Sequence, residues 1–359
     1  MKVLYISPQH ISGTLPLLCE GHRRRGNEAR YVTLFPSAFG FPEDLALRLH
    51  LHPDRNFIIK GRNLLLKSRG VDPDREIEGY PPMWRPGGFP ERTFFRLRDF
   101  LNRRRILSFI EEHGLDDYDV YHLEQGTGFF RDFRVVKEWA DRGKKIVCFY
   151  HGNDVRNRGV YPEIHRISKL NLSSELDLLD KYPGMRYLFL CIDTDQVKPI
   201  PNKNAKLKIV HATRSRYNKG SDFIIETVRE LEKKYPVELV LIENMPHDRC
   251  MKIKAGCDIC IDQIADKGGW GYGMSSVESL AQGLATCTYL NLQYEDFIPD
   301  HPFVNVNYDN LAVKLIGLIE DDDYRKEMAD RGRKWVVKTH SVNSVIGTLY
   351  DYYEEFGII

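Results

Sequence analysis

The sequence of 359 residues contains no apolar run near the ~20 residues that a bilayer-spanning helix needs. Its opening, MKVLYISPQH, becomes polar too soon for a secretion signal. The seven cysteines are scattered and odd in number, which argues against a disulfide framework. The net charge of +1 argues against nucleic-acid binding by bulk charge. We therefore expect a cytoplasmic protein with no nucleic-acid partner.

Two of the cysteines, Cys257 and Cys260, lie close together in the segment GCDICID. This short apolar run predicts a buried strand, whereas a metal or redox pair would favour a loop or a helix start. Because free cysteines are usually buried, we interpret both as structural. We recognise no spacing of His, Cys and carboxylates typical of a metal site, and we expect no metal and no cofactor.

Short apolar runs alternate with longer amphipathic segments along the whole chain, a pattern typical of parallel βαβ units. The pattern restarts near residue 207, so the sequence predicts an α/β protein with two doubly wound, Rossmann-like domains. Ligands of such folds bind at the carboxyl ends of the strands, so we expect the site in a cleft between the domains. The predicted strands are 2–7, 28–35, 119–123, 145–151, 186–192, 207–213, 237–243, 258–262 and 286–290, and the predicted helices 13–26, 219–235, 275–283 and 341–356.

We place the first domain at 1–195, with an irregular insertion at about 40–93 that is rich in Pro, Gly and Arg. The polar stretch 196–206 lacks periodicity and is typical of a linker. The second domain follows at 207–337. We assign the remaining segment, 338–359, to a closing helix.

Two cations follow the predicted strand 207–213: Arg214 and, five residues later, Lys219. Lys219 and Gly220 open a helix, whose first N–H groups carry partial positive charge. An arginine fork, a lysine and a helix start at one strand end suit a diphosphate. A solvated loop with incidental basic residues is the alternative.

Four glycines fall within the six residues from Gly268 to Gly273, directly before the helix that carries Glu278. Glycines let the backbone approach a ligand closely. The N–H groups around Gly273, Met274 and Ser275 would point at an anion, and Glu278 could accept hydrogen bonds from a ribose. An ordinary strand–helix turn would also explain the pattern.

Together, these two segments resemble the donor half of GT-B glycosyltransferases, most closely retaining family 4. The resemblance rests on R-x4-K-G at Arg214 to Gly220 and on E-x2-A-x-G at Glu278 to Gly283. It implies that Arg214 and Lys219 bind the diphosphate of a nucleotide sugar and that Glu278 holds its ribose. It also implies that the backbone of Gly273, Met274 and Ser275 contacts the donor.

The chain departs from this family at Trp270, where the first Glu of the E-x7-E motif would fall. In the family that carboxylate lies near the transferred sugar. Asp262 and Asp266 are nearby carboxylates that could take its place.

In the first domain, His151 and Asp154 follow a strand in FYHGNDVR, where family members carry an HG pair. We predict both as catalytic residues, with His151 bonding a sugar hydroxyl and Asp154 orienting it. A histidine satisfied at a strand end is the alternative. Gly13 matches the glycine that lets the first loop approach the donor. The candidates on the acceptor side are His10, Glu124 and Gln125.

The sequence therefore predicts a glycosyltransferase that uses a nucleotide-diphosphate sugar, with a UDP- or GDP-sugar expected as the donor. By resemblance the transfer is retaining and independent of metal. The acceptor would be a glycan, a lipid-linked molecule or a small molecule. Two alternatives stay open, a nucleotide-sugar epimerase or phosphorylase of the same fold and a non-catalytic sugar-nucleotide-binding subunit, the latter because of Trp270.

Positive charge concentrates between Arg48 and Arg105, where fourteen Lys and Arg residues accompany seven Asp and Glu residues. Within this region 93–113 predicts a helix with an apolar set among arginines. Such a helix could lie on the anionic inner face of a membrane and bring a lipid-linked acceptor to the cleft. A first-domain helix whose charges face water, or a polyanionic acceptor, would also explain the charge.

Overall fold

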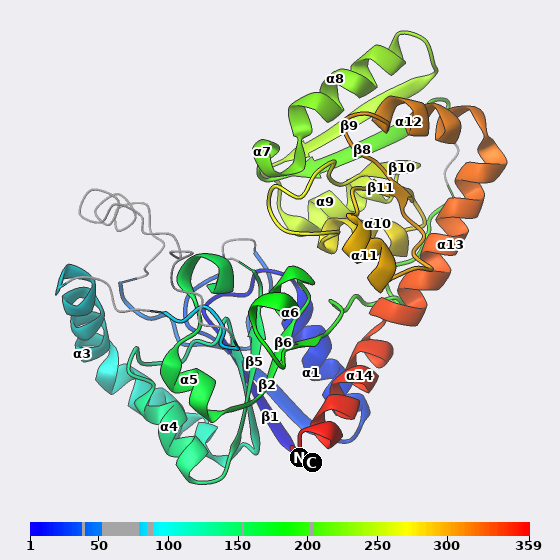
Figure 1. Ribbon diagram of the computed structural model, residues 1–359. Helices are drawn as coiled ribbons and strands as arrows, with labels where there is room; N and C mark the ends of the chain where they lie inside the picture. The colour runs from blue at the N-terminus through cyan, green and yellow to red at the C-terminus, as the bar shows by residue number, and fades with distance from the viewer. Residues whose placement is uncertain (38–39, 52–78, 85–88, 153, 202–203) are drawn as a thin grey trace. The chain divides into compact units, whose positions relative to one another are not determined.

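The computed structural model describes residues 1–37, 40–51, 79–84, 89–152, 154–201 and 204–359 (Figure 1). The chain forms two compact units. Unit 1 comprises Met1–Leu188 with Ile346–Ile359, and unit 2 comprises Phe189–Val345. Most of the predicted insertion at 40–93 lies outside the described residues.

Unit 1 is a parallel sheet with helices on its faces. In the described part of the chain the sheet has seven strands in the order β3-β2-β1-β4-β5-β6-β7, and every pairing is parallel. This is the strand order of a Rossmann fold with one added strand. Its elements are β1 (Lys2–Ser7), α1 (Thr14–Arg24), β2 (Glu28–Thr33), β3 (Leu45–Ala46), α3 (Phe89–Glu112), η2 (Leu115–Asp117), β4 (Val120–Glu124), α4 (Arg134–Asp141), β5 (Lys145–Tyr150), η3 (Asp154–Arg158), α5 (Pro162–Ile167), β6 (Ser168–Ser173), α6 (Asp177–Lys181), β7 (Arg186–Tyr187) and, from Ile346 on, α14 (Val342–Glu355).

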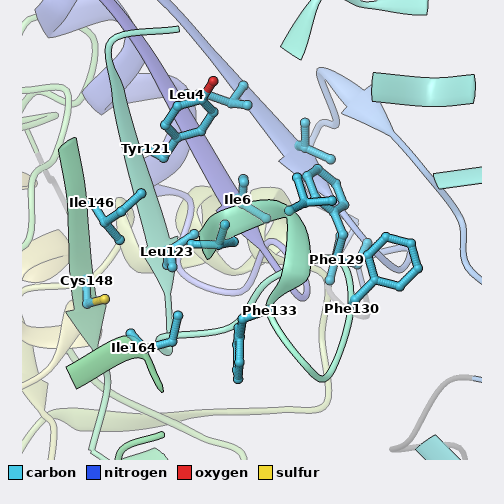
Figure 2. Packing of buried hydrophobic residues seen from close by; sticks show 14 of the residues in the cluster. Leu4, Ile6, Tyr121, Leu123, Phe129, Phe130, Phe133, Ile146, Cys148 and Ile164 are labelled. Carbon is cyan, nitrogen blue, oxygen red and sulfur yellow. The ribbon is translucent and has the colours of Figure 1, made fainter. Parts of the chain in front are cut away.

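The central strands of unit 1 are apolar along nearly their whole length because helices cover both faces of the sheet. β1, β4 and β5 supply one side of the core shown in Figure 2, and the aromatic segment that follows β4 packs against them. The labelled core residues from these elements are Leu4, Ile6, Tyr121, Leu123, Ile146, Cys148, Phe129, Phe130 and Phe133.

Helix α14 is fixed to unit 1 by a buried network of tyrosine and histidine side chains. The Tyr5 hydroxyl lies 2.8 Å from His22 Nε2, and His22 Nδ1 lies 3.0 Å from the Tyr350 hydroxyl. The Tyr353 hydroxyl bonds His122 in β4. Burial lowers the pKa of His22 to about 3, so its imidazole is neutral at physiological pH.

Unit 2 is a second parallel α/β layer. Among the described residues its sheet has five strands in the order β12-β11-β10-β8-β9, all parallel. Its elements are β8 (Leu207–Thr213), α7 (Arg216–Lys219), α8 (Ser221–Glu232), β9 (Val237–Glu243), α9 (His247–Lys254), β10 (Ile259–Ile261), α10 (Met274–Ala281), β11 (Ala285–Thr288), α11 (Leu292–Phe297), β12 (Val304–Asn305), α12 (Leu311–Glu320) and α13 (Asp322–His340). The α/β architecture with two doubly wound domains is therefore confirmed.

In unit 1 one strand prediction is wrong in its length, and β6 is a strand that the sequence pattern does not predict. The predicted strand 186–192 is only two residues long, because β7 pairs with β6 at Leu172 and Ser173 alone. β6 itself has the sequence SKLNLS, which contains no apolar run, and the pattern does not predict it. Pairing with β5 and burial of its two leucines, rather than intrinsic propensity, make it a strand.

The cysteine predictions agree with the structure. All seven cysteines are free, and both Cys257 and Cys260 are buried, the latter within β10. Among the described helices, including α3 and α14, none is long and apolar enough to span a membrane.

Candidate active site

The predicted donor-binding residues lie at the point where the strand order of unit 2 reverses. β8 pairs with β9 on one side and with β10 on the other. In open α/β sheets, ligands bind beyond the carboxyl ends of two such strands. The segment from Arg214 to Lys219 follows β8, and the segment from Asp262 to Gly273 follows β10. Sheet topology therefore brings the two predicted motifs to one location within unit 2 (Figure 1).

Lys219 is bound to the strand across this switch point. Its ammonium lies 2.8 Å from Asp262 Oδ1 and 3.0 Å from Gln263 Oε1. Ser276 in α10 donates to the other oxygen of Asp262 at 2.7 Å. An ammonium has three N–H groups, and these two acceptors use two of them. The buried Asp262 thus holds Lys219 beside the first turn of α10, with one N–H left over from these two bonds.

Arg214 is exposed immediately after the end of β8. Partial burial lowers the pKa of its guanidinium, and the Glu278 carboxylate opposes that shift. The guanidinium thus interacts electrostatically with the Glu278 carboxylate of α10.

Helix α10 begins at Met274. The residue before it, Gly273, has an extended backbone (φ −120°) and provides no side chain to cap the helix. The first N–H groups of a helix have no partner within it and carry partial positive charge. Around Gly273 the space that a Cβ would occupy has no atom within 4 Å. Met274 and Ser275, both half-buried, occupy the first turn. The start of α10 is thus an open, positively polarised surface beside the two cations.

Glu278, one turn into α10, is buried and held by two basic side chains. Lys254 Nζ donates to its Oε2 at 2.9 Å, and His247 Nε2 lies 2.7 Å from its Oε1. Burial alone would raise the pKa of Glu278, but these two partners lower it to about 2. The residue is an ionised acceptor with lone pairs beyond the two that these bonds use.

Lys254 and His247 were not among the predicted site residues. Lys254 has no exposed surface, and its ammonium also donates to the carbonyl oxygen of Ser275 at 2.8 Å. The spacing of His247 and Lys254 was a signal in the sequence, because two residues seven positions apart lie on the same face of a helix. Nothing in α9 alone, however, indicates which face meets α10.

The glycine-rich loop is fixed by its own polar residues. Asp266 accepts the Gly271 N–H at 3.1 Å and the Asn291 side chain at 2.8 Å. Gly271 has φ +74°, and a Cβ there would lie 2.2 Å from the buried Tyr294 ring. Glycine is therefore required at this position.

These contacts concern Asp262 and Asp266, the two carboxylates expected to replace the one that the chain lacks at Trp270. Asp262 is fully enclosed and bonded to Lys219, which does not favour the expected contact with a donor sugar. The Asp266 carboxylate maintains the loop instead. Trp270 itself is half-buried.

In unit 1, His151 and Glu124 form an ion pair at the ends of two adjacent strands, β5 and β4. His151 Nε2 lies 2.5 Å from Glu124 Oε2. Burial of the imidazole would lower its pKa, but the Glu124 carboxylate outweighs this effect and raises it. The pair is a buried carboxylate with a partly exposed, protonation-prone imidazole.

Asp154 does not orient the imidazole ring as expected. Its Oδ2 accepts the backbone N–H of His151 at 2.9 Å, and its Oδ1 accepts that of Val155 at 2.8 Å. Asp154 therefore fixes the turn after β5, whereas Glu124, predicted on the acceptor side, holds the ring.

The other predicted residues of unit 1 differ in accessibility. Gln125 has φ +59° and is half-buried, and its carbonyl oxygen accepts from Arg158. His10 is fully buried, with Nδ1 2.9 Å from the Pro42 carbonyl oxygen and its ring against Phe41. Gly13 precedes α1 with φ +75°. The enclosure of His10 does not favour a contact with an acceptor.

Comparison with known proteins gives similarity in structure without similarity in sequence. No family model matches the chain, and no curated protein matches it. A trehalose-6-phosphate structure from E. coli bound with UDP-2-fluoro glucose has a TM-score of 0.60 at 12% identity, over 98% of each chain. A TarM mutant from S. aureus in complex with Fondaparinux, alpha-GlcNAc-glycerol and UDP has a TM-score of 0.56 at 10% identity, over 98% of this chain and 100% of that one.

The glycosyltransferase SnogD from Streptomyces nogalater has a TM-score of 0.50 at 14% identity, over 98% of this chain and 99% of that chain. At such identities the likeness establishes the fold. The chain has the GT-B fold of glycosyltransferases, built from two Rossmann-like domains.

Proposed function

We propose that this protein is a glycosyltransferase that moves a sugar from a nucleotide-diphosphate sugar to an acceptor. One observation carries the proposal. Two cations, an open helix start and an ionised carboxylate belong to the segments where the strand order of unit 2 reverses. The contacts of Lys219 and Glu278 and the electrostatic effect of Glu278 on Arg214 support this. A nucleoside diphosphate matches this set, because its phosphates need positive charge and its ribose needs a hydrogen-bond acceptor.

In the proposed reaction the charges of unit 2 act on the leaving group. Negative charge develops on the departing diphosphate as its bond to the sugar breaks. Lys219, Arg214 and the N–H groups of Met274 and Ser275 would stabilise that charge, a role that needs no protein-bound metal. Asp262 positions the Lys219 ammonium, and Lys254 with His247 keeps Glu278 ionised for the ribose.

The identity of the donor rests on the structural neighbours. The E. coli neighbour holds UDP-2-fluoro glucose and the TarM neighbour holds UDP. We therefore favour a UDP-sugar, with a GDP-sugar as the alternative, and a hexose as the transferred group. Retention of configuration, as in family 4, is part of this proposal, with the leaving phosphate accepting the proton of the acceptor.

On the side of unit 1, His151 would donate a hydrogen bond from its second ring nitrogen to a sugar hydroxyl. Glu124 acts as the positioning residue, since it holds the ring through Nε2 and favours the charged imidazole. Gln125 and Gly13 remain candidates for contacts with the acceptor and donor.

The proposal is tested by incubating the protein with UDP-, GDP- and ADP-sugars and a panel of glycan, lipid-linked and small-molecule acceptors. Release of nucleoside diphosphate together with glycosylated product is expected. Interconversion of the sugar without nucleotide release would instead indicate an epimerase, and tight binding without turnover a non-catalytic subunit. Arg214→Ala combined with Lys219→Ala should abolish both turnover and nucleotide binding.

Arg216→Ala is the matched control for the double variant. Arg216 lies two residues beyond Arg214 but pairs with Glu243 and Asp222 on the surface. Its removal should leave nucleotide binding within about twofold of the wild type, since exposed ion pairs contribute little. Equal losses in the control and the double variant would contradict the site assignment.

We also propose that α3 contacts an anionic membrane surface through one side of the helix. Leu97 and Leu101 are half exposed, and Arg104 and Arg105 lie near them on exposed positions. Exposed apolar side chains among arginines favour the interface of anionic lipids. Sedimentation with vesicles that contain phosphatidylglycerol should capture the protein, and Leu97→Gln with Leu101→Gln should release it. Equal binding to neutral vesicles would refute this contact.

A further inference from the structure

Unit 1 contains a pocket of about 480 Å³ beside α3 that the proposed reaction does not use. Five arginines, three carboxylates and three aromatic rings line it. Its walls are α3 on one side and the turn before α4 on the other.

The carboxylates of the pocket are already neutralised by neighbouring arginines. The pairs are Asp99 with Arg98 (2.6 Å), Asp132 with Arg134 (2.7 Å) and Glu91 with Arg131 (3.5 Å). Asp99 also accepts the backbone N–H of Arg131 at 2.8 Å, which joins the turn to α3. The remaining charge of the pocket is therefore positive.

That positive charge belongs to Arg92, Arg96 and Arg103. Each is exposed, and none forms an ion pair with any residue that the structure describes. At 3.6 residues per turn, the three positions fall within an arc of ~40° on α3. They therefore present three guanidinium groups to the same pocket, with the strongly exposed ring of Phe100 (76%) among them.

Arg131 lies at the inner side of the pocket within a cage of aromatic rings. Its guanidinium carbon is 4.5 Å from the centre of the Trp84 ring, and 4.4 Å from those of Phe95 and Tyr161. Its Nε is buried and has no hydrogen-bond partner among the described residues. Burial and the neighbouring Arg158 lower its pKa to about 9, so a nearby anion would stabilise its charged form.

The pocket is connected to the acceptor-side residues through one ring. Arg158 lies 4.4 Å from the centre of the Tyr161 ring, the same distance as Arg131. Arg158 in turn donates to the carbonyl oxygen of Gln125, directly after Glu124. These contacts join the wall of the pocket to the segment of unit 1 that carries Glu124.

The geometry points to a binding site for a saccharide that carries phosphate or sulfate esters. The guanidinium forks match the tetrahedral oxyanions, and the exposed aromatic ring offers a surface for the apolar face of a sugar. Its identification as an acceptor subsite rests on the proposed function. Binding in the pocket itself does not.

A membrane surface fits this pocket less well than a saccharide. The pocket is concave, whereas the apolar residues Leu97 and Leu101 lie ~140° and ~180° around the helix from Arg92. The membrane contact proposed above therefore uses another side of α3. The two sites can be tested with different substitutions on one helix.

The test is calorimetric titration of the full chain with a heparin-derived sulfated oligosaccharide, a phosphorylated oligosaccharide and a neutral maltooligosaccharide. The anionic probes should bind, more weakly at higher salt, and the neutral probe should not. Arg92→Ala with Arg96→Ala should weaken binding at least roughly tenfold, since both lose charged hydrogen bonds. Arg104→Ala with Arg105→Ala, on the same helix but outside the pocket, should change it less than about twofold.

Equal losses in both double variants, or equal affinity for the neutral probe, would overturn the proposal. Binding to anionic vesicles without binding to either anionic oligosaccharide would also overturn it, in favour of a membrane surface. Nucleotide binding in unit 2 is measured in parallel, both for the wild type and for the variant that combines Arg92→Ala with Arg96→Ala. If nucleotides fail to bind the wild type while the anionic oligosaccharides still bind, the proposed function fails and the pocket proposal stands.

Discussion

Replacing Lys254 by methionine should destabilise unit 2 strongly at neutral pH. The substitution keeps most of the side-chain volume but removes the buried ammonium 2.9 Å from Glu278 Oε2. Glu278, only 9% exposed, would then keep its charge with His247 as its remaining basic partner. Breaking one partner of a buried pair typically costs about 3–5 kcal/mol.

The pKa of Glu278 gives a second route to this magnitude. Its partners lower that pKa from 4.5 to about 2, and each pKa unit corresponds to about 1.4 kcal/mol. The carboxylate therefore contributes roughly 3 kcal/mol to folding. Because the folded-state pKa is the lower one, this contribution is complete above about pH 4.5 and is lost as pH falls toward 2.

Hydrogen exchange is the suitable assay, since it reports the opening of unit 2 separately from unit 1. Amides of β10 and α10 in Lys254→Met should exchange with an opening free energy about 3 kcal/mol below the wild type at pH 7. The difference in opening free energy should narrow as pH falls below 4.5. Adding Glu278→Gln to the Lys254→Met variant should restore part of the lost opening free energy. A loss under about 1 kcal/mol, or a loss that does not depend on pH, would refute this reasoning.

Two further predictions concern other residues of the two units. The raised pKa of His151 implies a stabilising charge that is complete below its unfolded pKa of about 6.5 and is lost as pH rises through the folded value. Glu124→Gln should therefore shift the alkaline limb of the pH profile of the proposed sugar transfer to lower pH, and an unchanged profile would exclude the ion pair from that reaction. Gly271→Ala should lower the opening free energy of unit 2 by about 2–4 kcal/mol, because its Cβ would meet Tyr294 and its φ is positive. Gly273→Ala, with an ordinary backbone and open space, should cost under about 1 kcal/mol, and similar costs for both glycines in hydrogen exchange would contradict the account.

The architecture could be predicted because apolar runs in a parallel sheet are continuous. KVLYIS and VELVLIE became β1 and β9 with the expected bounds. The strand SKLNLS could not be predicted, since its pairing partner rather than its composition determines its structure. Similarly, the helix expected at 219–235 begins only at Ser221 and ends at Glu232, because Gly220, in a left-handed conformation, separates it from the short α7 that ends at Lys219.

The candidate site, too, could be predicted from the sequence only in part. Motif spacing indicated Arg214, Lys219 and Glu278, because sequence-local chemistry at strand ends carries that signal. The partners that position them come from other elements: Asp262 from the end of β10 and Lys254 from α9. Such long-range pairs depend on helix packing, which a single sequence does not specify.

The most direct test is a crystal structure of the protein grown with UDP, and with GDP if UDP does not bind. Diphosphate oxygens should lie within about 3 Å of Lys219 Nζ and the Arg214 guanidinium, and the ribose hydroxyls should donate to Glu278. A nucleotide bound elsewhere, or one whose ribose does not contact Glu278, would contradict the assignment of unit 2 as the donor site.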